Sequence, residues 1–157
     1  MNRAPSLPES PFALRDYQEE AIAAIRSAFF ERGLNRLLVV HPTGSGKTIL
    51  FAHLLRDPSI SQWIASYPKT ERRVLVLAHR KELLEQAAHR MRQVNPHCRI
   101  AIEQGHQTAP QDTDVVVASV ASLARTPNRL ARLKPEAIRL VVIDEAHHAV
   151  AKTYRTM

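Results

Sequence analysis

The chain is poor in the residues that stabilise secreted and fibrous proteins. Its 157 residues include one cysteine, four glycines and only 5% aromatic residues. The single Cys98 cannot form an internal disulfide, which excludes a disulfide-stapled scaffold, and the scarcity of glycine excludes a collagen-like repeat. No apolar run approaches the roughly eighteen residues of a membrane span, and the N-terminus has no apolar signal segment. We therefore expect a cytoplasmic protein with no membrane partner.

The remaining composition indicates one folded domain with a basic surface. Hydrophobic residues make up 45% and charged residues 24% of the chain, which is typical of globular proteins, and a domain takes roughly 100 to 200 residues. The formal net charge of +7 favours a polyanionic partner, and a merely basic surface is the alternative. Residues 1–11 contain three prolines and are expected to form a flexible lead-in, so that the folded part spans 12–157.

Short apolar runs alternate with stretches of helical periodicity along the folded part. Residues 16–30 and 81–94 place apolar side chains on one helical face, and 122–133 does so with an interruption at Pro127. The predicted strands are 37–40, 74–78, 99–102, 115–118 and 140–143. Unbroken runs of Val, Leu and Ile are typical of parallel strands covered by helices on both faces, which predicts an α/β fold. Residues 57–73 are expected to be a loop that Trp63 and Ile64 attach to the body.

A glycine-containing loop follows the first predicted strand and precedes a helix-compatible stretch. It comprises His41, Pro42, Thr43, Gly44, Ser45, Gly46, Lys47 and Thr48. Strand, glycine loop, Lys-Thr and helix occur in the order of a P-loop, in which backbone N–H groups and a helix N-terminus bind phosphate. Lys47 is the candidate ligand of the β and γ phosphates, and Thr48 of Mg2+. The general pattern has glycine where this chain has His41, so the prediction rests on the second half of the motif, and a chance match is the alternative.

Two carboxylates follow the last predicted strand directly. At the carboxyl end of a parallel strand, Asp144 can meet the Mg2+ held by Thr48, while Glu145 can accept a proton from an attacking water. Capping of a following helix is the alternative role for both carboxylates. His147 and His148 come next, but adjacent histidines diverge and no third ligand has a suitable spacing, so a zinc site is not expected.

Together, these motifs resemble the first RecA-like motor domain of superfamily 2 helicases and translocases, in the group of DEAH-type helicases and restriction-enzyme motor subunits. The resemblance spans about residues 12–157 and implies a three-layer P-loop domain with a mostly parallel sheet that binds ATP and Mg2+. Residues 14–18 resemble the adenine-reading element of the family, which assigns Arg15 and Gln18 to the nucleotide. A polar position on the first helix is the alternative for Gln18.

The same resemblance supplies candidate nucleic-acid contacts. Residues 78–86 are similar to a motif that lies along a nucleic-acid backbone, where Arg80 is the expected phosphate contact and a solvated helix cap is the alternative. Ser119 occupies the place of another backbone-contacting motif, although the family commonly has Thr, Pro and Gln there, and Gly105 matches a glycine turn near the nucleic acid. By resemblance, His147 couples the nucleotide site to a second domain.

The resemblance predicts the ATP-binding portion of a nucleic-acid-dependent ATPase, a helicase or translocase with DNA preferred over RNA. Members of the family continue with a strand that lies between the P-loop strand and the acidic-pair strand, and with a second RecA-like domain carrying arginine fingers. The sequence stops at Met157, so the sheet is expected to be incomplete and the isolated chain to hydrolyse ATP weakly. The alternatives are a non-catalytic, nucleotide-responsive module that binds nucleic acid or protein, and a small P-loop kinase.

Overall fold

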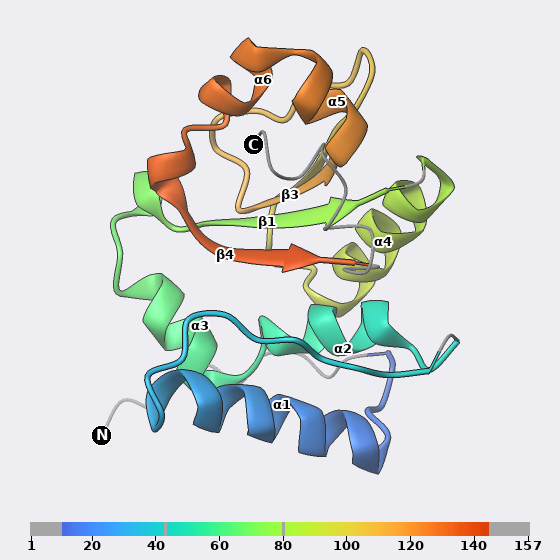
Figure 1. Cartoon of the computed structure of the whole chain (residues 1–157), viewed down its shortest axis with the longest axis vertical. Helices are drawn as coiled ribbons and strands as arrows, with labels where there is room; N and C mark the ends of the chain where they lie inside the picture. Colours follow the sequence, from blue (N-terminus) through green and yellow to red (C-terminus); the bar gives the residue numbers. More distant parts are fainter. Residues whose placement is uncertain (1–10, 43, 80, 145–157) are drawn as a thin grey trace.

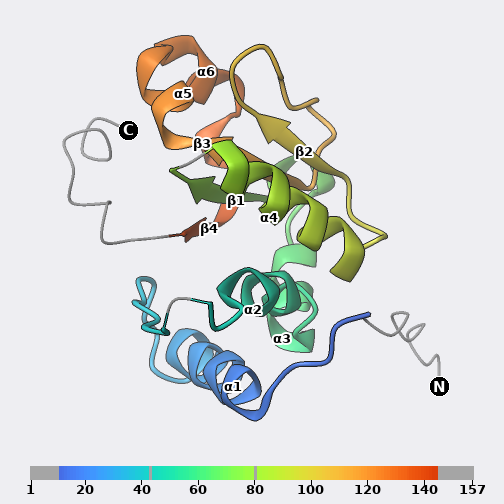
Figure 2. The same cartoon turned by 90° about the vertical axis from the view of Figure 1, so that its right-hand side faces the viewer.

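A parallel four-stranded sheet with the strand order β2-β3-β1-β4 forms the centre of the molecule (Figures 1 and 2). The computed structural model describes residues 11–42, 44–79 and 81–144, so the lead-in predicted for 1–11 lies almost entirely outside the described residues. The strands are β1 (Arg73–Ala78), β2 (Ile100–Glu103), β3 (Val115–Ser119) and β4 (Ile138–Ile143). Every residue of β1 and β3 is buried, as expected for central strands. The predicted α/β class and four of the five predicted strands are confirmed.

Helices lie on both faces of this sheet. They are α1 (Asp16–Phe30), α2 (Lys47–Leu54), α3 (Pro58–Ala65), α4 (Lys81–Val94), α5 (Val120–Arg125) and α6 (Pro127–Arg132), with 3-10 turns at Lys69–Glu71 and Pro135–Ala137. Successive side chains of β1 serve two cores, because Val74 and Val76 pack with α1, α2 and α4, whereas Leu75 and Leu77 pack with α5. Within the described ranges, no helix has the length and apolar character that a bilayer span requires.

The segment after α2 is helical, where a loop was expected from the sequence. Asp57 is the N-cap of α3, and its Oδ1 accepts hydrogen bonds from the backbone N–H groups of Ser59 at 3.0 Å and Ile60 at 3.2 Å. Asp at the N-cap followed by Pro58 at the first helical position is a strong start signal, which outweighs the polar composition of the segment. The predicted attachment is confirmed, since Trp63 packs against the main core and stacks on Phe29.

The prediction of a buried strand at 37–40 is wrong for this structure. The segment has no strand assignment, and although Leu37 and Val39 pack against the core, Leu38 is 75% and Val40 82% exposed. This alternation is that of an extended segment with only one covered face. Among the described residues β4 pairs with β1 alone, so no strand connects the sheet to residues 37–40. Apolar composition predicts the tendency to extend, but a strand also needs a hydrogen-bonded neighbour.

Candidate nucleotide site at the carboxyl ends of the strands

The 44–47 loop turns sharply into the N-terminus of α2. Gly44 and Gly46 both have φ of 78°, in the left-handed region that side chains disfavour, and Gly46 is the N-cap of the helix. The turn is closed by the N–H of Ser45, which donates to the carbonyl of Pro42 at 3.2 Å. The first N–H groups of α2 therefore face the loop with the positive end of the helix dipole, as a phosphate site requires.

Gln18 fastens α1 to this loop. Its side chain is only 4% exposed, and its Nε2 donates to the carbonyls of Ser45 and Gly46, each at 3.2 Å. The Oε1 accepts from the N–H of Arg15 at 3.0 Å, so both ends of the amide are bonded. Residue 46 has φ of 78°, which favours glycine, and a Cβ there would also lie 2.8 Å from this Nε2, so the Gln18 amide would have to move. The adenine-reading roles of Arg15 and Gln18 stay predictions, whereas the structure places Gln18 against the phosphate loop.

Tyr17 is a site residue to which no role was assigned from the sequence, although it lies within the 14–18 element. Its hydroxyl donates to the carbonyl of Ser45 at 2.6 Å, and its ring lies 5.5 Å from that of His41. The first turn of α1 thus forms one wall of the loop through two adjacent side chains. Helical spacing alone could not reveal this role, because the loop lies 28 residues away along the chain.

The donors around the loop fit a nucleotide phosphate. The Nζ of Lys47 lies across the loop and donates to the carbonyls of His41 at 3.3 Å and Pro42 at 3.2 Å. The Oγ of Ser45 is buried, with no hydrogen-bond partner among the residues that the structure describes. An ammonium, an unsatisfied hydroxyl and a helix N-terminus all suit an anion. Thr48 follows in the first turn of α2, where its hydroxyl would be a suitable Mg2+ ligand.

Asp144 lies at the same end of the molecule as the loop. It directly follows β4, is half-buried, and its N–H donates to the carbonyl of Leu77 at 2.9 Å. Both views show the end of β4 and the turn before α2 on the same side, at the carboxyl ends of the strands (Figures 1 and 2). Ligands of parallel α/β sheets bind outside this edge. The predicted residues Thr43, Arg80, Glu145 and His147 lie outside the described residues.

Ser119 and Gly105 lie close together at the carboxyl ends of β2 and β3. Ser119 is 4% exposed and caps α5, since its Oγ accepts from the N–H of Ser122 at 3.4 Å. Gly105 is exposed with φ of 53°, and its N–H donates to the Oγ of Ser122 at 3.4 Å. The structure therefore gives the Ser119 hydroxyl a capping role, and leaves Gly105 on an exposed loop. Their nucleic-acid contacts stay predictions.

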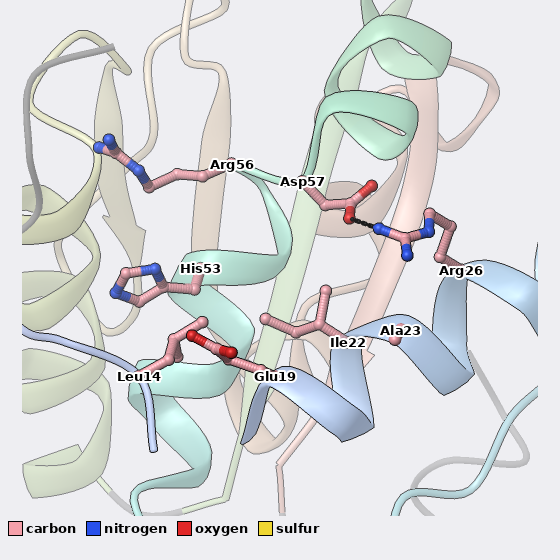
Figure 3. Close-up of a pocket in the computed structure, with 8 residues that line it drawn as sticks. All are labelled: Leu14, Glu19, Ile22, Ala23, Arg26, His53, Arg56 and Asp57. Carbon is pink, nitrogen blue, oxygen red and sulfur yellow. Dashed lines mark hydrogen bonds and ion pairs between the residues drawn. The ribbon is translucent and has the colours of Figure 1, made fainter. Parts of the chain in front are cut away.

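A cavity of about 350 Å³ lies at the other end of α2, between α1 and the start of α3 (Figure 3). The Arg26 guanidinium pairs with Asp57 there at 2.9 Å, and the Nη1 of Arg56 donates to the Val94 carbonyl at 2.7 Å. Burial lowers the pKa of His53, an effect that the nearby Arg56 charge adds to and the Phe12 carbonyl opposes. These charged groups bond to the protein itself, and we call this cavity between α1, α2 and α3 the helix seam.

A family model described as "Type III restriction enzyme, res subunit" (ResIII) matches residues 11–157, and so includes both the phosphate loop and Asp144. The chain belongs to this family. It is accordingly an N-terminal, RecA-like helicase domain of superfamily 2, as the resemblance predicted.

Two relatives of the chain are named as ATP-dependent helicases. IRC3 of Saccharomyces cerevisiae is 38% identical over 148 residues, and irc3 of Schizosaccharomyces pombe, named as a mitochondrial protein, is 41% identical over 142 residues. The alignments cover 92% and 90% of this chain, but 20% and 22% of the relatives. The chain thus spans about a fifth of their length.

Solved structures support the same fold. The SWI2/SNF2 ATPase core of Sulfolobus solfataricus, in complex with dsDNA, superposes with a TM-score of 0.70 at 20% identity, over 94% of this chain and 30% of that one. A nuclease-deletion mutant of the Type ISP restriction-modification enzyme LlaGI, with a DNA substrate mimic, gives 0.62 at 20% identity, over 87% and 15%. At this identity, the likeness shows the fold.

The prediction of a cytoplasmic location is contradicted by these comparisons. The S. pombe relative carries a mitochondrial name. The lack of an apolar segment excludes only a secretory signal, whereas mitochondrial targeting segments are amphipathic and rich in arginine. The single Cys98, which cannot form an internal disulfide, does not distinguish the cytoplasm from the mitochondrion either.

Proposed function

We propose that this chain is the ATP-binding portion of a nucleic-acid-dependent helicase or translocase that acts on DNA. The observation that carries the proposal is the phosphate loop itself: two glycines in the left-handed region lead into α2, with Lys47 across the loop and Asp144 at the same end of the sheet. Two relatives named as ATP-dependent helicases and two DNA-bound structural neighbours support it.

We assign the following roles to the residues of this site. Lys47 binds the β and γ phosphates, together with the N–H groups at the start of α2. Thr48 and Asp144 would hold Mg2+, which would supply neutralisation of the charge that develops on the phosphates. Glu145, in the DEAH sequence 144–147, accepts the proton of the attacking water, and His147 links the site to a second RecA-like domain in the longer protein.

The basic composition supports a nucleic-acid partner, and the predicted backbone-contacting residues lead us to place it at the same edge of the sheet. The formal charge of +7 favours a polyanion, and the exposed Gly105 loop together with Arg80 supplies the proposed backbone contacts. DNA is preferred over RNA because both neighbouring structures were solved with DNA or a DNA mimic. A second RecA-like domain would complete the motor, since the relatives are about five times as long as this chain.

The test is binding of a fluorescent ATP analogue with Mg2+, followed by ATP turnover with and without double-stranded DNA. We expect Lys47→Ala to abolish nucleotide binding, since it removes the ammonium from the loop, while Lys69→Ala, on the exposed 3-10 turn at the other end of β1, binds normally. Equal binding by the Lys47→Ala variant would refute the nucleotide site. Because the isolated chain is expected to hydrolyse ATP only weakly, turnover is also measured on the longer protein with its second RecA-like domain, where nucleotide-dependent DNA binding without any turnover would instead support the non-catalytic module.

A further inference from the structure

A fully buried carboxylate ends strand β2. The side chain of Glu103 is 0% exposed, although a charge inside a protein is costly unless it is paired and hydrogen-bonded. Its Oε1 lies 2.9 Å from the Nη2 of Arg132 and 3.3 Å from the Nε of Arg129. Its Oε2 accepts the backbone N–H of Ala109 at 2.8 Å. We call Glu103, Arg129 and Arg132 the Glu103 clamp.

The clamp holds the 104–108 loop, which follows β2. The Nη2 of Arg129 donates to the carbonyl of Gly105 at 2.6 Å, and the Nη2 of Arg132 donates to the Oγ1 of Thr108 at 3.3 Å. The loop also closes on itself through two backbone hydrogen bonds between Gln104 and Gln107, at 3.1 and 2.7 Å. Glu103 therefore holds this segment at three points. Arg129 links it to Gly105 in the first half of the loop, Arg132 links it to Thr108 in the second half, and Glu103 itself accepts the Ala109 N–H just beyond the loop.

The two arginines come from α6, and both guanidinium groups reach the buried Glu103, although the side chain of Arg132 is still 44% exposed. The side chain of Arg129 is 14% exposed, and its Nη1 is buried without a hydrogen-bond partner in the described part of the chain. A guanidinium engaged in this way is not free to neutralise a phosphate and release counterions. Arg129 therefore differs from an exposed basic residue: its bonds shape the neighbouring loop.

The held loop lies at the edge where the proposed nucleic-acid contacts gather. Gly105 on this loop is bonded through Ser122 to Ser119 at the end of β3. A loop held in its binding shape before association avoids the ordering cost that a mobile loop meets on binding. Resting on the proposed function, we infer that Glu103, Arg129 and Arg132 are positioning residues, which preorganise the 104–108 loop to meet a nucleic-acid backbone.

The test uses Arg129→Gln, because Glu103 then keeps Arg132 and the Ala109 N–H, and the fold is spared. Hydrogen exchange of 104–108 is measured without DNA, and binding of fluorescein-labelled double-stranded DNA is measured by anisotropy over a salt series. We expect faster exchange in the loop and a DNA Kd raised about tenfold. The slope of log Kd against log salt and the affinity for the ATP analogue stay unchanged, because no phosphate contact is removed. Glu103→Gln, which leaves the loop residues themselves intact, also gives faster exchange in the loop.

Arg26→Gln is the matched control. This substitution also removes an arginine from a buried carboxylate, because Arg26 pairs with Asp57, whose side chain is 3% exposed. Asp57 keeps its two backbone N–H donors, and the pair lies in the helix seam, away from the 104–108 loop. It leaves loop exchange and DNA affinity unchanged. Unaltered exchange or unaltered Kd in Arg129→Gln overturns the inference, and so does a salt slope reduced by about one, which marks a direct phosphate contact. If the unsubstituted protein does not bind DNA, both the proposed function and the positioning role are refuted. If it binds DNA and Arg129→Gln has the same loop exchange and DNA Kd, only the positioning role is refuted.

Discussion

Replacing Gly46 with alanine tests the contact between α1 and the phosphate loop. An alanine at φ of 78° occupies the left-handed region, at a cost of about 1 to 2 kcal/mol. Its Cβ would also lie 2.8 Å from the Nε2 of Gln18. The flexible amide can move away, but it then loses its two hydrogen bonds to the loop, worth about 1 kcal/mol each. We expect a total loss of about 3 to 4 kcal/mol of unfolding free energy.

Gly33 provides the control for this prediction. It has φ of 66°, and a Cβ added there would meet nothing within 4 Å among the described residues, so Gly33→Ala has the backbone cost alone, about 1 to 2 kcal/mol. Urea unfolding with linear extrapolation gives both values. We also expect Gln18→Ala to remove the difference between the two glycine variants, because the contact is then gone. If Gly46→Ala is no more destabilising than Gly33→Ala, the Gln18 contact does not stabilise the loop.

Two further predictions concern the helix seam and the extended segment. The lowered pKa of His53 means that the folded state binds its proton less tightly than the unfolded chain does, so stability is lost as pH falls below about 6.5. We expect His53→Gln to reduce this loss in unfolding experiments at pH 7.5 and 5.5, and an unchanged loss in the variant would contradict the assignment. Leu38→Ser changes the unfolding free energy, measured by urea unfolding, by less than about 0.5 kcal/mol, because Leu38 is 75% exposed. Val76→Ala, in the core, lowers it by about 2 kcal/mol or more. Similar losses at both positions would show that 37–40 is a buried strand after all.

Much of the fold follows from local sequence signals. Unbroken apolar runs predicted β1, β3 and β4, and the interruption at Pro127 predicted the break between α5 and α6. The family and the phosphate loop were also predicted from motif order, because a P-loop needs its glycines, lysine and helix in immediate succession. The α3 helix has a local start signal as well, in Asp57 and Pro58, but the polar composition of the segment favoured a loop.

The sequence by itself determined the fold class and the family and predicted the phosphate loop, because these depend on residues that are neighbours along the chain. The tertiary structure decided the contacts between distant residues. Whether 37–40 becomes a strand depends on a pairing partner, which apolar composition cannot supply. The bonds from Tyr17 and Gln18 to Ser45, and from Arg132 to Glu103, join residues that are 28, 27 and 29 positions apart. Such bonds form only once packing has brought α1 to α2 and β2 to α6.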